Sequence, residues 1–229
     1  MPPFTYAAMA MLVVWGMLLI VSDRTRLEQL AMTALGLFLS PHAFELISTD
    51  DRAGASDALA VGLPEFVFAG ALFGTAAVFA HVMIPSLAAK WRGERIRFSH
   101  PAAHWVAKLL IVAGVWMFVS LSASLVFAFE ALPAVTLGGL LVGIYVVADR
   151  KDLLMDALLT AVALAMLVFI VEQVFFARVF PEAAAGFWEP ANLSGILLGG
   201  IPAEELLWAA IVGFTVGPLY EYVRHLRLT

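Results

Sequence analysis

The chain has 229 residues, of which 62% are hydrophobic and 14% are charged, with a formal net charge of −5 and a mean hydropathy of +0.94. Because a soluble domain carries about 25% charged residues, this composition predicts a membrane protein. The chain contains no cysteine, which excludes a disulfide framework, a thiol nucleophile and a cysteine-ligated metal. It has no basic domain and no nucleic-acid-binding module, so we expect no nucleic-acid partner.

Apolar runs of helical length recur along the whole chain. About 20 apolar residues cross a bilayer core, and a backbone in lipid must satisfy its own hydrogen bonds. The fold class predicted is therefore all-α membrane, with seven transmembrane helices near residues 4–22, 27–48, 57–84, 101–129, 131–148, 152–178 and 193–224. Pro41, Pro64 and Pro202 fall within these predicted helices, which a helix bundle tolerates. The first apolar run lacks a small-residue cleavage site, so we interpret it as a retained helix.

The basic residues divide unevenly between the two sides of such a bundle. Ten of the 13 lysine and arginine residues fall on one side: Arg24, Arg26, Lys90, Arg92, Arg95, Arg97, Arg150, Lys151, Arg224 and Arg227. The positive-inside rule places this side in the cytoplasm. We therefore expect a multi-pass protein of a prokaryotic cytoplasmic membrane, with its N-terminus outside and its C-terminus in the cytoplasm.

Three sequence landmarks occur twice, in the same order. They are Asp23-Arg24 and Asp149-Arg150, then Glu45 and Glu172, then Pro64-Glu65 and the Pro202 to Glu204 segment. This internal repeat predicts two three-helix units joined by a linker helix, a 3+1+3 arrangement. The expected parts are a first repeat over 1–86, a cytoplasmic loop and linker helix over 87–130, and a second repeat over 131–229. An odd linker makes the two repeats parallel, and sites of such proteins often lie between the repeats.

Four carboxylates, Glu65, Glu172, Glu204 and Glu205, are predicted to lie inside the membrane. A charged carboxylate there costs about 2.5–3.5 kcal/mol, so such residues are candidates for function. Glu204 and Glu205 are expected about twelve residues into the last helix, where a neutral acid beside a charged one suits general acid and base chemistry. The structural alternative is that these acids bond to arginine, serine or free carbonyls and tie helices together. A solvated role at the interface is expected for the other acids considered, Glu45, Glu130, Glu182, Glu189 and Glu221.

The histidines and glycines indicate no metal or cofactor. His100 and His104 are one helical turn apart, but no acidic third ligand follows them, so we expect no metal there. No glycine-rich nucleotide fingerprint occurs, so no flavin or other cofactor is expected. Gly195, Gly199 and Gly200 are expected to let the last helix approach a neighbour. His42, beside Pro41, is interpreted either as part of a cavity or as a helix contact.

The segment "GFWEPANLSGILLGGIPAEELLWAA" (186–210) resembles the non-flavin, integral-membrane carotenoid lycopene cyclases, which occur as two short subunits or one fused chain. The pattern comprises Trp188, a Leu-Gly-rich approach through Gly199 and Gly200, then Pro202, Glu204, Glu205 and Trp208. The resemblance is strongest over residues 150–224. The first half departs from it, with Phe66 where a paired acid would stand and no tryptophan before Pro64.

This resemblance implies an isomerase of carotenoid biosynthesis that closes the linear ends of lycopene into rings without net redox change. It implies Glu204 or Glu205 as the acid that protonates a terminal alkene, with Glu65 or Glu172 as the base or stabiliser. The residues expected to bind substrate are Trp208, Pro202, Trp188, Phe68 and His42. The expected partners are lipid and an apolar polyene or another isoprenoid that enters from the bilayer.

Other functions remain open from the sequence. A 3+1+3 chain also resembles small carriers of the SWEET and PQ-loop type, although it contains no Pro-Gln pair, and proton-coupled transport could use Glu65 and Glu204. A cyclase homologue without activity is a further alternative. A retinal photoreceptor is excluded because residues 193–224 contain no lysine. The sequence leaves a homo-oligomer, the ring type and the number of ends cyclised undecided.

Overall fold

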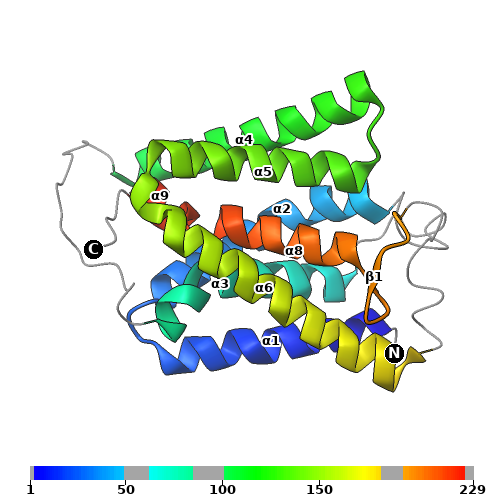
Figure 1. Ribbon diagram of the computed structural model, residues 1–229. Helices are drawn as coiled ribbons and strands as arrows, with labels where there is room; N and C mark the ends of the chain where they lie inside the picture. The colour runs from blue at the N-terminus through cyan, green and yellow to red at the C-terminus, as the bar shows by residue number, and fades with distance from the viewer. Residues whose placement is uncertain (1–2, 49–61, 85–100, 182–192, 225–229) are drawn as a thin grey trace.

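The structure, a computed structural model, describes residues 3–48, 62–84, 101–181 and 193–224. It is a bundle of helices that run roughly along one long axis (Figure 1). The first four helices are α1 (Pro3–Val21), α2 (Arg26–Ser48), α3 (Leu63–Met83) and α4 (Pro101–Phe127). The second half contains α5 (Ala131–Asp149), α6 (Leu154–Glu172), α8 (Ala203–Val216) and α9 (Leu219–Arg224). A 3-10 turn, Lys151–Leu153, precedes α6, and a π-helix, Gln173–Val179, extends it.

Five helical segments in the described residues are long and apolar enough to cross a membrane: Leu63–Met83, His104–Phe127, Leu132–Asp149, Lys151–Phe176 and Ala203–Arg224. A sixth, Thr5–Val21, is apolar but shorter. The prediction of an all-α, multi-pass membrane protein is therefore confirmed. The direction of the chain across the membrane and the 3+1+3 arrangement stay predictions.

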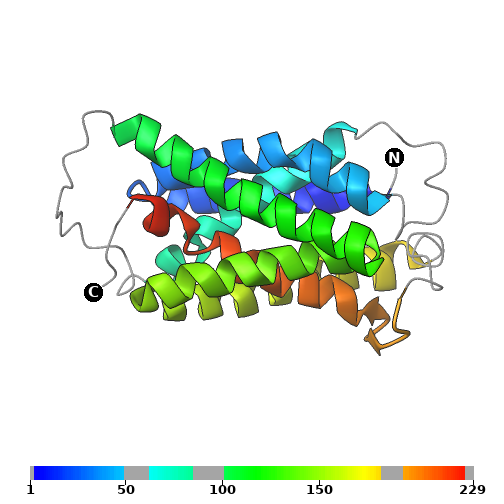
Figure 2. The same ribbon diagram turned by 90° about the horizontal axis from the view of Figure 1, so that it is seen from above.

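The two central helices, α3 and α8, are largely buried. α3 packs against α1 and α2, and α8 packs against α5 and α6, while α4 packs mainly on α5 (Figures 1 and 2). Small residues permit this close packing, as is usual between membrane helices. A Cβ added to Gly213 of α8 would lie 2.6 Å from the carbonyl oxygen of Thr160 in α6. The backbones of α6 and α8 therefore meet without an intervening side chain.

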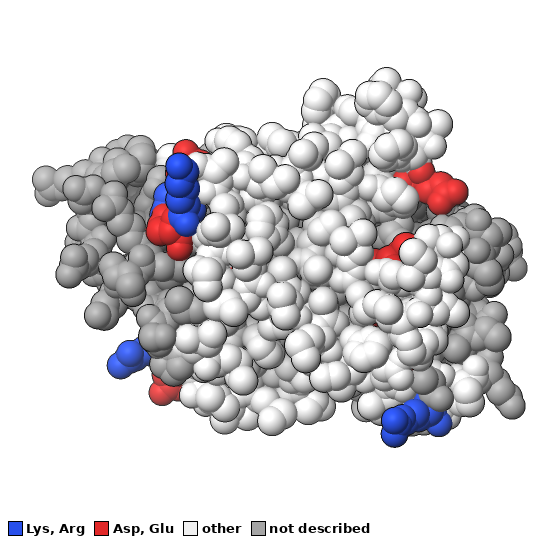
Figure 3. Space-filling view, viewed as in Figure 1, with Lys and Arg blue, Asp and Glu red and all other residues white. Residues whose placement is uncertain are grey.

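The outer surface is apolar along the length of the bundle. Phe118 and Leu125 of α4 are 72% and 82% exposed, and Ile20 of α1 is 76% exposed. In the space-filling view, the visible charged residues of the described part lie toward the two ends (Figure 3). An apolar belt between charged ends is the surface expected of a protein embedded in lipid.

The last helix differs from the prediction of one continuous helix over 193–224. A short antiparallel hairpin, β1 (Leu197–Leu198) with β2 (Ile201–Pro202), precedes α8. Its turn residues Gly199 and Gly200 have φ of +61° and +92°, the signature of a type I′ turn. Gly195, with φ +79°, also lies outside any helix, so these three glycines are not part of the last helix. Gly199 does permit a close approach to a neighbour, because a Cβ there would lie 2.6 Å from Gln173 Nε2. Pro218 lies at the second interruption, between α8 and α9, where it lacks the N–H of a continuous helix.

The predicted positions of the prolines are corrected accordingly. Pro202 has an extended ψ of 137° and precedes α8, so it is not inside a helix. Pro64 lies in the first turn of α3, where a missing N–H costs nothing. Gly62 precedes the start of α3 at Leu63, and residues 57–61 lie outside the described residues. Pro41 alone of the three lies within a helix interior, in α2.

Candidate functional site

Glu204 and Glu205 lie in the first turn of α8, directly after the hairpin. This corrects the expectation that they lie about twelve residues into a helix, because the hairpin takes the place of the predicted first turns. The backbone N–H of Ser194 donates to Glu204 Oε1 over 2.6 Å. Glu204 Oε2 is buried and makes no hydrogen bond within the described part of the chain. The positive end of the α8 dipole also favours a negatively charged carboxylate at this position.

The hairpin beside Glu204 is fixed by specific contacts. Gln173 Nε2, at the start of the π-helix, donates to the carbonyl oxygen of Gly199 over 2.5 Å. The N–H of Ala203 donates to the carbonyl of Ile196 over 2.9 Å. Ile201 and Phe176, each 1% exposed, form a small apolar cluster between the hairpin and the π-helix. These contacts hold the start of α8 in one position relative to the end of α6.

Glu172 is the last residue of α6 and is 9% exposed. The π-helix that follows it is of a kind found frequently at functional sites. Tyr6 of α1 stacks on Phe175 of this π-helix and on Phe180, which follows it, with ring centroids 6.3 and 5.0 Å away. The end of α6 and the start of α8 lie at the same end of the bundle (Figure 1). Glu172 and Glu204 therefore belong to neighbouring helices at one end of the molecule.

Glu65 lies in the first turn of α3 and is partly buried. A Cβ added to Gly62 would lie 2.8 Å from Glu65 Oε2, so this carboxylate folds back over the start of its own helix. α3 begins at the same end of the bundle as α8 (Figure 1). No hydrogen bond joins Glu65 to Glu204 in the described residues. The structure thus brings the predicted carboxylates to one end without joining these two into a pair.

The residues expected to bind substrate are described only in part. Pro202 is buried in the hairpin, and Trp208 and Phe68 are half-buried and pack against the main core. His42 belongs to α2, but its side chain lies outside the described part, as does that of Glu45. Trp188 also lies outside the described residues.

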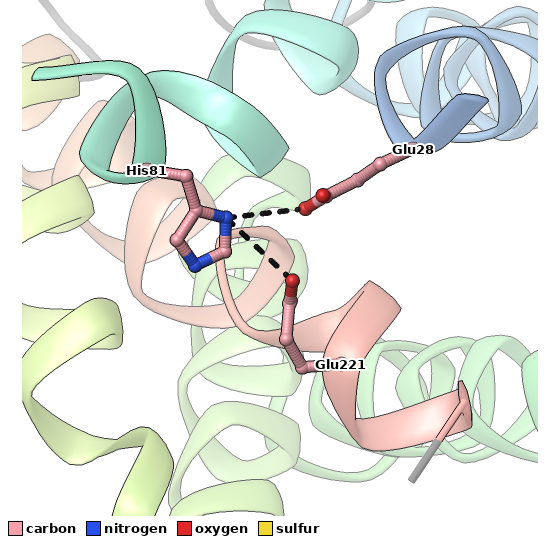
Figure 4. A group of neighbouring side chains, drawn as sticks. All are labelled: Glu28, His81 and Glu221. Atoms are coloured by element: carbon pink, nitrogen blue, oxygen red, sulfur yellow. Dashed lines mark ion pairs between the residues drawn. The ribbon is translucent and has the colours of Figure 1, made fainter. Parts of the chain in front are cut away.

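A second polar cluster lies at the opposite end of the bundle, where α3 ends (Figure 4). It consists of His81 at the end of α3, Glu28 in the first turn of α2, Asp156 in α6 and Glu221 in α9. Their exposed fractions are 4%, 7%, 1% and 0% in that order. His81 Nδ1 lies 3.5 Å from Glu28 Oε1 and 3.6 Å from Glu221 Oε1, and His81 Nε2 lies 3.7 Å from Asp156 Oδ1.

His81 is a basic partner common to the three carboxylates of this cluster. Arg224 also lies close enough for its charge to act on Glu28. Arg224, on α9 with Glu221, donates a hydrogen bond from Nη1 to Tyr220 Oη over 2.6 Å. Its Cζ lies 4.2 Å from the centroid of the Trp105 ring. Three carboxyl groups and one imidazole are thus enclosed together. Buried charges are costly unless they are paired or coordinate a metal.

This cluster was not predicted from the sequence. Glu221 was expected to be solvated near an interface, yet it is fully buried because α9 turns into the bundle against α8 and α4. Glu28, His81 and Asp156 were not singled out. A signal was present for two of them, because Asp156 and His81 stand in the apolar stretches "LLMDALL" and "VFAHVMI". An ionisable residue in such a stretch is a functional candidate by default.

The fold and the apolar surface define a class, that of multi-pass, all-helical membrane proteins. Within it, residues 130–223 match the family model for lycopene cyclase, which supports the resemblance found in the sequence. This match covers α5 to α9, including the hairpin, Glu172, Glu204 and Glu205. No curated protein and no solved structure matches the chain. Together the match and the fold support a carotenoid cyclase-like protein.

Proposed function

We propose that the protein is a lycopene cyclase-like isomerase that closes the end of an apolar polyene inside the membrane. The observation that carries this proposal is the match of residues 130–223 to the lycopene cyclase family, which includes the acids at the start of α8. The substrate class is lycopene or another linear isoprenoid. No cofactor is required, because ring closure by proton addition and loss changes no oxidation state.

The proposed reaction needs one proton donor and one proton acceptor. A carboxylic acid adds a proton to the terminal alkene, which leaves a tertiary carbocation. The neighbouring double bond attacks this cation and forms the ring, and a carboxylate removes a proton to restore a double bond. The product is therefore an isomer of the substrate. Glu204 or Glu205 is the proposed donor, and Glu172 or Glu65 the proposed acceptor or stabiliser.

The surroundings of Glu204 support this role. Ser194 N–H fixes Oε1 at 2.6 Å, whereas Oε2 is buried and makes no hydrogen bond in the described residues. A carboxyl group fixed in one orientation is preorganised, and preorganisation strengthens electrostatic catalysis. Trp208, one turn along α8, presents an aromatic ring that can stabilise a developing cation.

The apolar exterior supports access from lipid. Leu207, beside Trp208 on α8, is 58% exposed, and Leu197 of the hairpin is 59% exposed. A flat polyene dissolved in the bilayer would meet this surface without crossing water. We propose that it binds against the hairpin end of α8, in the cell membrane, with the two three-helix units around it.

The proposal is tested in cells that accumulate lycopene. Expression of the wild-type chain is expected to yield a cyclic carotene on chromatography, and Glu204→Gln or Glu205→Gln is expected to abolish it. Glu130→Gln is the matched control, because Glu130 is an exposed acid that precedes α5 within the same matched segment. Unchanged lycopene in cells with well-folded wild-type protein would refute the proposal, as would full activity of both variants.

A further inference from the structure

We propose that Glu28, His81 and Glu221 bind a single divalent first-row transition-metal ion, and that Asp156 orients His81 for this role. The site lies at the end of the bundle away from the hairpin and does not depend on the proposed cyclase activity. Its donors come from α2, α3 and α9, which are far apart in the sequence. Figure 4 shows the two carboxylates pointing toward the same ring nitrogen.

The donor atoms have the spacing of a metal site. His81 Nδ1 lies 3.5 Å from Glu28 Oε1 and 3.6 Å from Glu221 Oε1, and the three ligand atoms lie within 4.8 Å of one another. Two donors about 2.1 Å from one tetrahedral ion are about 3.4 Å apart. The three atoms can therefore reach one ion with only small side-chain adjustments.

Buried carboxylate oxygens inside the cluster are the second observation that points to a bound cation. Glu28 Oε1 and both carboxylate oxygens of Glu221 are buried and have no partner at full hydrogen-bond geometry in the described residues, although the two side chains are close enough to interact with each other. Buried polar atoms normally have a partner, and each exception calls for an explanation such as an ion. A cation between Glu28 and Glu221 would supply the missing partner to both side chains.

Asp156 is placed to orient His81 in the way that metal-binding histidines are oriented. Its Oδ1 lies 3.7 Å from His81 Nε2, and both of its oxygens are buried without a hydrogen bond in the described part. Histidines that bind metals almost always direct their other ring N–H to a carboxylate or carbonyl, which fixes the tautomer. A proton on Nε2 leaves the Nδ1 lone pair directed at Glu28 and Glu221. A small contraction of the cluster around an ion would shorten the contact with Asp156.

The charge of the cluster suits a divalent cation. Two ligating carboxylates neutralise an ion of charge +2, and the third carboxylate, Asp156, faces His81 on its other side. Carboxylate oxygens suit manganese and magnesium, whereas imidazole suits zinc and iron. The mixed set of two carboxylates and one imidazole therefore favours Mn²⁺, Fe²⁺ or Zn²⁺. Magnesium is disfavoured because it prefers oxygen ligands and retains several waters.

The first test measures metal in the full-length protein, purified in detergent without chelators. After removal of metal with a chelator, the protein is incubated with Mn²⁺, Fe²⁺ or Zn²⁺, and bound metal and the unfolding temperature are recorded. The expected result is one ion per chain and a higher unfolding temperature for at least one metal, because an ion that binds only the folded state stabilises it. Folded protein that retains none of these ions and shows no shift overturns the proposal.

The second test uses variants. His81→Asn and Glu221→Gln are expected to lose binding, and Asp156→Asn is expected to weaken affinity about 10- to 100-fold while one ion still binds at saturation. His104→Asn, the same change at a histidine of α4 outside the cluster, is the control and is expected to keep wild-type affinity. Wild-type affinity in folded His81→Asn or Glu221→Gln overturns the proposal. If those variants do not fold, the result for Asp156→Asn decides, and unchanged affinity there removes the proposed role of Asp156.

Discussion

Individual buried hydroxyl groups in the bundle differ in whether they form a hydrogen bond. Thr215 is fully buried, and its Oγ1 donates to the carbonyl oxygen of Gly139 over 2.8 Å, which links α8 to α5. Thr136 Oγ1, in α5, is also buried but has no hydrogen-bond partner in the described residues. Both threonines bury a hydroxyl, but only Thr215 forms a hydrogen bond between helices. Comparing the two therefore separates the stabilisation by the hydrogen bond from the cost of burying the hydroxyl.

Replacing each threonine with valine, which has nearly the same shape, should therefore change the free energy of unfolding differently at the two positions. Thr215→Val is expected to lower the free energy of unfolding by about 0.6–1.7 kcal/mol, the range measured for such bonds between membrane helices. Thr136→Val is expected to leave stability unchanged or to raise it, because no bond is lost. Reversible unfolding in mixed micelles measures both. A larger loss for Thr136→Val than for Thr215→Val would contradict the hydrogen-bond assignment.

The residue scale is also where sequence reasoning was least complete. The rule that a carboxylate in an apolar run indicates function drew attention to Glu172 and Glu204, because it needs only local sequence. The cluster around His81 could not be assembled in this way, since Glu28, Asp156 and Glu221 come from three other helices. Contacts between distant segments depend on packing, which no local pattern contains.

At the element scale, glycines decide how closely helices approach. A Cβ on Gly213 would lie 2.6 Å from the Thr160 carbonyl oxygen and 2.8 Å from Ala161 Cα, both backbone atoms of α6. Neither atom can rotate away as a side chain would. A Cβ on Gly114 of α4 would meet no atom within 4 Å.

Gly213→Ala is therefore expected to cost about 1–3 kcal/mol of unfolding free energy, the usual cost of overpacking a core. Gly114→Ala is the matched control and is expected to have no effect or a slight stabilising one, because alanine favours helix. The difference in unfolding temperature between the two variants measures the effect. Equal stability of both would mean that α6 and α8 do not meet at Gly213.

The positions of most helices were well predicted. The last helix was not, and the reason lies in its local sequence. Residues 4–22 and 131–148 were expected to be helical, and the structure has Pro3–Val21 and Ala131–Asp149. Such boundaries follow from apolar length alone. The last helix was predicted ten residues too long because hydropathy does not distinguish an apolar hairpin such as "ILLGGIP" from a helix. The Gly199-Gly200 pair, typical of a type I′ turn, was the overlooked signal.

At the scale of the whole molecule, the direction across the membrane remains a prediction of the positive-inside rule. Arg150 carries part of this signal at the junction of α5 and α6, where its guanidinium donates to both oxygens of Asp152 over 2.8 and 2.6 Å. This bond raises the pKa of Arg150, so the cation is retained at every physiological pH. Glu130 lies at the other end of α5.

Single cysteines introduced by substitution can test this direction. The chain has no cysteine of its own, so only the introduced residue reacts with a thiol reagent. An impermeant maleimide added to intact cells is expected to label Glu130→Cys and not Lys151→Cys, which should react only after permeabilisation. The reverse pattern would place the C-terminus outside. Both residues are exposed and flank α5, so they form a matched pair.

The two halves of the molecule lead to two separable claims, a cyclase reaction at the hairpin end and a metal ion at the other. The family match covers only residues 130–223, so the cyclase claim depends chiefly on the second half. The metal claim needs both halves, because Glu28 and His81 come from the first and Glu221 from the second.

Mass spectrometry of the carotenes that purified protein forms from lycopene, in H₂O and in D₂O, tests whether a proton starts the ring closure. In H₂O we expect a cyclic product with the mass of lycopene. In D₂O the same product should gain one deuterium for each ring, because the proton that starts each closure comes from an exchangeable acid. The absence of a cyclic product from folded protein, a product lighter by two hydrogens, or a ring without deuterium would rule out ring closure started by a proton.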